Sequence, residues 1–223
     1  MTHTLTLHSI EPVTHDVNRL RFDKPAGYDF TPGQATELAV DKDGWRDEQR
    51  PFTFTSLPGD DFLEFTIKSY PSHDGVTEQI GKLTKGDTVL IEDAWGAIED
   101  KGDGVFIAGG AGVTPFISIL RARDKAGKLN PCTLIFSNKT EADIILQKEW
   151  EAMQGLGVLF TLTDEDKTRF RSGQIDKDLL RETVAEWEQY FYICGPKQMV
   201  KDISATLTDL GVPEAKIVHE DLG

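Results

Sequence analysis

The residues best able to do chemistry gather in four short segments, which read RPFTFTS (50–56), SHDGVTEQIGKL (72–83), IAGGAGVTPF (107–116) and YICGPKQMV (192–200). In the first segment an arginine can form two parallel hydrogen bonds to a phosphate. An aromatic ring and hydroxyls can pack against a flat polar ring and hydrogen-bond to it. In the second, glycine opens a short expected helix whose free N–H groups and a threonine hydroxyl suit an anion. These two segments therefore indicate binding of phosphate and of a planar group.

These segments also have purely structural interpretations that need no ligand. RPFTFTS is compatible with an ordinary half-buried strand, in which the two phenylalanines share one face and Thr53 and Thr55 share the other. The helix start at 75–77 is also compatible with simple capping. Cys194 has no histidine nearby in sequence, and a buried cysteine is more often inert packing than a nucleophile.

The glycine cluster in IAGGAGVTPF is more informative through its position than through its spacing. Its order, Gly109-Gly110-Ala111-Gly112, is not the G-x-G-x-x-G dinucleotide fingerprint, and no Gly-Lys-Ser/Thr follows to make a P-loop. The cluster nevertheless follows an apolar strand and precedes a helix whose first turn suits Pro115. Because ligands bind at the carboxyl ends of strands in parallel sheets, we expect a ligand at this turn.

The elements that must position these segments follow two different patterns along the chain. Up to about Glu99, short strands separated by turns predict an antiparallel barrel or sandwich, interrupted by one helix at 76–83. After KGDG, apolar strands alternate with helical patterns, which predicts a parallel, doubly wound sheet. The expected helices there cover 114–127, 142–156, 176–187 and 197–211. We place the boundary near 100–103.

Composition narrows the function. The 223 residues, 39% hydrophobic and 28% charged, suit a globular protein with one large or two modest domains. The net charge is −14, of which residues 1–100 carry 9 Lys+Arg against 19 Asp+Glu, so nucleic acid and anionic membrane are not expected partners. No apolar run approaches the ~20 residues of a membrane span, and no secretory signal is visible. Two cysteines cannot supply a four-thiolate iron–sulfur cluster, no metal site is expected, and a cytoplasmic setting is the simplest interpretation.

Taken together, the four segments resemble the ferredoxin–NADP reductase superfamily of flavoproteins in order and rough spacing along essentially the whole chain. The motifs that carry the resemblance are RPFTFTS, GVT (75–77), GGAGVTPF (109–116) and CGPKQM (194–199). The resemblance implies two domains, an FAD-binding antiparallel β-barrel over 1–100 and a Rossmann-like, NAD(P)-binding α/β domain with a parallel sheet over 101–223.

The resemblance also implies roles for individual residues of the flavin domain. Arg50, followed by Pro51 in the same motif, would bind the flavin pyrophosphate. Phe52 would lie along the isoalloxazine ring, and Thr53 would hydrogen-bond near its hydride-accepting nitrogen, which makes Thr53 a candidate catalytic residue. The pyrophosphate would also be held at a helix start by Gly75, Val76 and Thr77.

On the nucleotide side, the resemblance implies that Cys194 is a second candidate catalytic residue, with its thiol beside the reacting nicotinamide carbon rather than attacking it. Gly195 and Pro196 would position the nicotinamide together with it. The nucleotide site would be lined by Gly110, Gly112, Val113, Thr114 and Pro115. The flavin would carry the electrons, while the protein supplies orientation and electrostatics.

Three places depart from the superfamily pattern. Phe52 stands where a tyrosine is usual and lacks its hydroxyl. DAWGAI (93–98) only loosely resembles the Gly-Pro-aromatic-Gly segment, and Leu222 stands where many relatives have a stacking aromatic residue.

The choice of nucleotide rests on charge. LIFSNKTEADIILQKEW (134–150) resembles the corresponding segment of NADH-dependent cytochrome reductases, and Thr163-Asp164 stands where NADPH-dependent members commonly have a serine–arginine pair. The Asp164 carboxylate would repel a 2′-phosphate and accept hydrogen bonds from ribose hydroxyls, which favours NADH over NADPH. Arg169 and Arg171 lie close behind and could restore phosphate binding.

The resulting functional prediction is an FAD-dependent NAD(P)H oxidoreductase that passes electrons to a separate acceptor. Ferredoxin, flavodoxin, a haem protein and a small molecule all remain open, although acidic carriers would be repelled by the acidic first half. The alternative is a flavin-containing electron-transfer or regulatory subunit of a larger complex.

Overall fold

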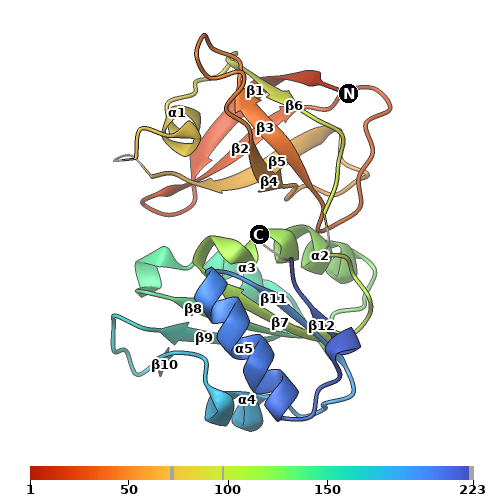
Figure 1. The fold of residues 1–223 in the computed structure, drawn as a ribbon, viewed down its shortest axis with the longest axis vertical. Helices are drawn as coiled ribbons and strands as arrows, with labels where there is room; N and C mark the ends of the chain where they lie inside the picture. Colours follow the sequence, from red (N-terminus) through yellow and green to blue (C-terminus); the bar gives the residue numbers. More distant parts are fainter. Residues whose placement is uncertain (71–72, 97, 221–223) are drawn as a thin grey trace.

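The computed structural model describes residues 1–70, 73–96 and 98–220, and these form two units stacked end to end (Figure 1). The first unit is a six-stranded antiparallel sheet in the spatial order β4-β3-β6-β1-β2-β5. A bridge between Phe54 and Phe65 connects the two ends of that order, so the sheet curls into a nearly closed barrel. Its elements are β1 (His3–Pro12), β2 (Val17–Asp23), β3 (Ala35–Val40), β4 (Arg50–Thr53), β5 (Phe62–Lys68), α1 (Val76–Gly81) and β6 (Thr88–Ile91).

The barrel core comes from the alternation of apolar and polar residues along its strands. In β1, for example, Leu5 and Leu7 are fully buried between more exposed neighbours. Phe54, directly after β4, is also fully buried and stacks on Phe30 with ring centroids 4.4 Å apart. Helix α1 docks onto this core through Val76 and Ile80.

The second unit is a parallel sheet in the order β10-β9-β8-β7-β11-β12. Every residue of β7, GVFIAG, is buried, as expected for a central strand covered on both faces. The strands are β7 (Gly104–Gly109), β8 (Thr133–Asn138), β9 (Gly157–Leu162), β10 (Arg171–Ser172), β11 (Tyr190–Cys194) and β12 (Ile217–Val218). The helices are α2 (Thr114–Lys125), α3 (Gln147–Ala152), α4 (Lys177–Thr183) and α5 (Lys197–Asp209), with short 3₁₀ turns η1 (Gly110–Val113), η2 (Glu141–Asp143) and η3 (Glu214–Lys216).

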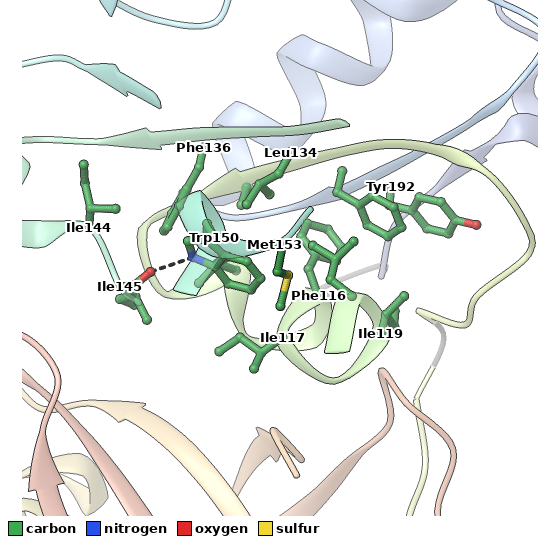
Figure 2. Close-up of a cluster of buried hydrophobic side chains, with 14 of the residues drawn as sticks. Phe116, Ile117, Ile119, Leu134, Phe136, Ile144, Ile145, Trp150, Met153 and Tyr192 are labelled. Carbon is green, nitrogen blue, oxygen red and sulfur yellow. Dashed lines mark hydrogen bonds between the residues drawn. The ribbon is translucent and has the colours of Figure 1, made fainter. Parts of the chain in front are cut away.

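Helices cover both faces of this sheet. Figure 1 shows α2 and α3 on the face toward the barrel and α4 and α5 on the opposite face. On the barrel side, Phe116, Trp150 and Tyr192 are among the fully buried side chains that pack between α2, α3 and the sheet (Figure 2). The observed architecture confirms the predicted class, an antiparallel barrel followed by a doubly wound parallel sheet, and selects the barrel over the sandwich.

One expected helix is broken. The pattern over 142–156 predicts a continuous helix, but the chain forms η2, then extended backbone at Ile144, then α3. Two β-branched residues in sequence favour extended backbone, and the carbonyl of Ile145 accepts a hydrogen bond of 2.7 Å from the Trp150 indole (Figure 2). Leu146 then turns the chain with a positive φ of 56°. The isoleucines thus fill the core beside Trp150 instead of continuing a helix.

No helix among the described residues is long and apolar enough to cross a membrane.

Candidate functional site

The structure brings two of the predicted segments together at one edge of the parallel sheet. β7 and β11 are neighbours, with Cys194 in register with Ala108, so both strands end at the same level. From β7 the chain proceeds through β8 and β9 on one side, whereas β11 lies on the other side. The connections therefore diverge between β7 and β11, and open α/β sheets bind ligands in the crevice at such a switch point.

The three glycines of the cluster serve different purposes in this turn. A Cβ atom on Gly112 would overlap the carbonyl group of Cys194 and the Cα atom of Gly195, so Gly112 lets the two turns touch. Gly109 similarly makes room for the Met199 sulfur atom. Gly110 has a φ of +52° and faces open space. Gly110 is thus the glycine with open space beside it that a ligand could fill, while Gly112 allows the two turns to pack against each other.

Helix α2 begins directly after this turn, as predicted. Its N-cap, Val113, is buried, and proline occupies its first turn at Pro115. The hydroxyl of Thr114 is half-buried and makes no hydrogen bond to any described residue, so it can donate to a ligand.

Cys194 ends β11 in a setting that keeps its proton. Burial and, to a smaller extent, the nearby Glu220 carboxylate raise the pKa of the Cys194 thiol to about 12. The thiol is therefore neutral at pH 7, which agrees with a contact role and not with a nucleophile. After it, Gly195 is half-buried and Pro196 is exposed at the N-cap of α5.

Glu220 itself is a site residue that the sequence reasoning did not select. It also approaches the barrel, since a Cβ atom on Gly96 would lie 3.5 Å from its Oε1 atom. The carboxylate therefore stands between Cys194 and the loop after β6, in reach of both units. No local motif marks it, because the contact joins the end of the described chain to two distant segments.

On the barrel, β4 lies at one end of the strand order, paired with β3 through Arg50–Leu38 and Thr53–Ala35. Arg50 and Pro51 are exposed, while Phe52 and Thr53 are half-buried. Among the described residues, the Arg50 guanidinium has polar contacts only with the adjacent Gln49 carbonyl oxygen at 2.6 Å and a Glu48 carboxylate oxygen at 3.4 Å.

These observations on β4 fit a phosphate and a planar ring. The guanidinium retains donors for an anion, and the Thr53 hydroxyl has no hydrogen-bond partner among the described residues. Phe52 packs partly against the barrel core and leaves part of its ring accessible.

The helix start at 75–77 lies on the same barrel. Gly75 is the N-cap of α1 with extended backbone, and no side chain caps the helix. Val76 is buried, whereas the half-buried Thr77 makes no side-chain hydrogen bond to a described residue. Gly75 takes the N-cap position, so the segment remains compatible with simple helix capping, and the predicted anion contact stays a prediction.

Asp164 lies exposed just beyond the carboxyl end of β9, and its N–H donates to the Lys139 carbonyl oxygen at 2.9 Å. The basic groups behind it are already paired. Lys167 contacts Glu141 at 2.6 Å and Glu165 at 2.9 Å, and the hydrogen bonds that it donates to these carboxylates raise its pKa. Arg169 pairs with Glu151 and lies 3.8 Å from Glu141.

Arg171, the second arginine of that stretch, pairs with Glu182 at 3.0 Å. Lys139 is the exception in this region, since it is exposed and has no ion pair with a described residue. The preceding residue, Asn138, is only 5% exposed, and neither of its side-chain amide atoms has a hydrogen-bond partner among the described residues.

A group of possible metal ligands joins the two units elsewhere, formed by His15, Asp16 and Asp143. Both carboxylates already serve the fold, Asp16 through an ion pair of 2.8 Å with Lys68 and Asp143 through the capping box with Thr140. Residue 97 of DAWGAI and Leu222 lie outside the described residues.

Comparison with known proteins agrees with this geometry. Residues 106–205 match the family described as the oxidoreductase NAD-binding domain. The chain is 26% identical over 95% of its length to the reductase component of propane 2-monooxygenase from Mycolicibacterium goodii, and 30% identical over 89% to NADH-cytochrome b5 reductase 2 from Mycosarcoma maydis. The chain spans 65% and 63% of the lengths of these relatives, so their activities are carried over only as proposals.

Solved structures support the same assignment. The CS-b5R domains of human Ncb5or in the NAD⁺ form share 26% identity with a TM-score of 0.86, over 97% of this chain and 68% of that chain. A ferredoxin NADP⁺ reductase from Neisseria gonorrhoeae with bound FAD and NADP shares the fold over 98% of both chains, with a TM-score of 0.86 and 23% identity. By its two-domain fold, its matched nucleotide-binding domain and these relatives, the chain is similar to proteins of the ferredoxin–NADP reductase superfamily.

Proposed function

We propose that this protein is an FAD-dependent NAD(P)H oxidoreductase that passes electrons from a reduced nicotinamide nucleotide, through flavin, to a separate acceptor. The observation that carries the proposal is the meeting of Gly112 with Cys194 and Gly195 at the switch point of the parallel sheet. This contact builds a nucleotide-binding floor on the same side of the sheet as helix α2, which faces the barrel (Figure 1).

The flavin is proposed to bind along β4 and α1. Arg50 would hold its pyrophosphate together with Gly75, Val76 and Thr77, while Phe52 and the Thr53 hydroxyl would contact the ring. Bound flavin supplies the capacity to accept two electrons as a hydride and to release them singly.

The nucleotide is proposed to lie over Gly110 and Val113–Pro115. Cys194, Gly195 and Pro196 would fix the nicotinamide, and the neutral Cys194 thiol would exclude water beside it without reacting. Glu220 adds a carboxylate at this point, which can hold or pass a proton.

We propose NADH as the preferred nucleotide. Asp164 places a negative charge where a 2′-phosphate would approach. In addition, Lys167 and Arg169, two nearby cations that would otherwise attract the phosphate, are already paired with carboxylates of Glu141, Glu151 and Glu165. Lys139 remains as a competing attraction, so the preference is expected to be moderate rather than absolute.

The acceptor is proposed to be a separate redox protein in the same cytoplasmic setting. The similar proteins include a reductase component of naphthalene 1,2-dioxygenase from Pseudomonas putida and cytochrome b5 reductases, which supports an iron–sulfur or haem carrier. The two cysteines of this sequence cannot hold an iron–sulfur cluster themselves. Flavodoxin or a small acceptor would use the same flavin edge.

The test is native purification followed by anaerobic titration. We expect a yellow protein whose flavin absorption is bleached by reduced nicotinamide nucleotide, faster by NADH than by NADPH. Protein purified with FAD present that binds no flavin would overturn the proposed function, and faster bleaching by NADPH would overturn the nucleotide preference alone. Steady turnover with ferricyanide as acceptor would distinguish an autonomous enzyme from a subunit that is active only within a complex.

A further inference from the structure

Helix α2 presents one face to the barrel, and its polar side chains cross the boundary between the two units. Thr114, Ser118 and Arg121 are spaced four and then three residues apart, so they share that face. The Gly33 N–H donates to Ser118 Oγ at 3.0 Å in a fully buried contact. About one turn after the predicted nucleotide contact at Thr114, the helix therefore reaches the barrel.

Arg121 makes the most extensive of these contacts. Its Nη1 atom donates to the Thr55 carbonyl oxygen at 2.7 Å and to Glu64 Oε1 at 2.8 Å, both in the barrel. Its other edge grips Glu149 of α3 with two hydrogen bonds, from Nε at 2.6 Å and from Nη2 at 2.9 Å. A single planar guanidinium thus connects three segments in fixed orientation.

On the barrel side, Glu64 and the end of the flavin segment form one hydrogen-bonded unit. Glu64 is only 1% exposed and also accepts from Arg21 Nε at 2.9 Å and Thr55 Oγ1 at 3.0 Å. The Thr55 N–H donates to the Glu64 carbonyl oxygen at 2.7 Å. Because Thr55 lies two residues after Thr53, any shift of the Thr55–Glu64 pair also moves the proposed flavin contact at Thr53.

The ion pair between Glu64 and Arg121 is costly to break. Burial disfavours the charged form of Glu64, yet attraction from Arg121 and hydrogen bonds lower its pKa. Burial likewise opposes the charge of Arg121, but Glu149 and Glu64 raise its pKa. Both groups therefore stay charged, and loss of one partner would leave a buried charge unmatched.

We propose that Arg121 is a positioning residue that fixes the flavin strand against the nucleotide-binding turn, and so sets the approach of the nicotinamide to the flavin. This inference rests on the proposed function. The same rigid helix carries Thr114 at its start and Arg121 two turns later. Loss of the Arg121 contact would therefore displace the hydride donor, the nicotinamide, relative to the acceptor, the flavin.

The test compares Arg121→Met with Arg123→Met in the flavin-loaded protein. Arg123 is a useful control because it lies on the same helix, is more buried than Arg121 and also pairs with two carboxylates, but its partners are Asp100, Asp103 and Cys132 instead of barrel groups. For Arg121→Met we expect the limiting rate of flavin bleaching at saturating NADH to fall about ten- to a hundred-fold, since small misplacements cost that much. The NADH concentration for half-saturation and the rate of bleaching by dithionite should stay within about two-fold of wild type, because neither depends on donor–acceptor alignment.

For Arg123→Met we expect a lower melting temperature with a nearly normal limiting rate. Equal rates in the two variants, or a loss in Arg121→Met confined to the melting temperature, would overturn the proposal. If Arg121→Met does not fold, Arg121→Lys keeps the charge but removes the planar guanidinium. It should lower the limiting rate of bleaching by an intermediate amount.

A readout without any cofactor separates this inference from the proposed function. In protein free of flavin and nucleotide, amide hydrogen exchange at 54–57 should accelerate in Arg121→Met and not in Arg123→Met. Unchanged exchange there would sink the role of Arg121, whereas a wild-type flavin that no nucleotide bleaches would sink the proposed function alone.

Discussion

At β4 the proposed ligand groups are side chains on the terminal strand of a sheet, whereas at the ends of β7 and β11 they are mainly backbone groups in two interlocked turns. Arg50 and Pro51 are exposed and contribute little to packing. Gly112 and Gly195, by contrast, lie where any added side-chain atom meets backbone atoms. Function and folding should therefore be separable on the barrel and, at Gly112 and Gly195 of the nucleotide edge, inseparable.

The difference follows from how each fold leaves room for a ligand. A barrel satisfies its core with inward-facing residues and leaves outward-facing side chains free to vary. A doubly wound sheet must bring its strand ends and helix starts close together to expose N–H groups, and close approach of two backbones requires glycine.

The largest expected effect comes from Gly112→Val. Its Cβ atom would overlap the carbonyl group of Cys194, and rigid backbone cannot move aside as a flexible side chain can. Overpacking of this kind costs about 3 kcal/mol, which corresponds to a fall in melting temperature of about 6–12 °C. Calorimetry of the cofactor-free protein checks it.

Gly110→Ala is the matched comparison within the same turn. Nothing lies within 4 Å of a Cβ atom there, so only its φ of +52° opposes the substitution, at a cost of about 1 kcal/mol. Nucleotide affinity should fall in Gly110→Ala with little change in melting temperature. A larger stability loss in Gly110→Ala than in Gly112→Val would reverse the roles assigned to the two glycines.

The next effect concerns the barrel and comes from Arg50→Met. A charge-assisted hydrogen bond to a phosphate contributes about 1.5–3 kcal/mol, so the FAD dissociation constant should rise about ten- to a hundred-fold. The melting temperature of the apoprotein should not change, because the guanidinium has only weak local partners. Quenching of FAD fluorescence during titration measures the affinity.

Arg46→Met is the control for this prediction. Arg46 lies in the loop that leads into β4, has an exposure similar to that of Arg50, and pairs with Asp41 at 2.6 Å and Asp43 at 2.5 Å. Its removal should leave FAD affinity unchanged. Equal weakening by both substitutions would mean that the general charge of the loop, and not a specific contact at Arg50, attracts the flavin.

The same contrast explains what could be predicted from the sequence. Strand alternation predicted an antiparallel barrel or sandwich, and the alternation of strands with helices predicted the parallel sheet, because burial imposes those periods on local sequence. The break after η2 was not predictable, since the Trp150–Ile145 hydrogen bond and the packing of two isoleucines override local helix propensity.

Site residues divide in the same way. Arg50 and Gly112 lie in recognisable motifs, so sequence alone could select them. Glu220 and Arg121 could not be selected, because their significance comes from partners far away in the chain, Cys194 for the first and Thr55 and Glu64 for the second. Pairing of Lys167 and Arg169 with carboxylates was equally invisible, since the sequence showed only that cations follow Asp164.

That pairing gives the smallest and most specific prediction, made with the double substitution Glu141→Gln and Glu165→Gln. Lys167 would lose both carboxylate partners, and Arg169 would lose the nearby Glu141 charge while keeping Glu151. The freed cations should attract a 2′-phosphate, so the ratio of kcat/KM for NADPH to that for NADH should rise about three- to ten-fold at low salt. Because these groups are exposed, the rise should shrink as ionic strength increases.

The matched control removes two charges at the opposite edge of the same sheet. Glu186 and Glu188 are exposed just before β11 begins, so Glu186→Gln with Glu188→Gln changes the net charge equally without freeing a cation beside Asp164. The nucleotide ratio should stay constant in this control. An equal rise in both double variants would assign the effect to the overall negative field, whereas no rise in the first would leave Asp164 alone as the source of the preference.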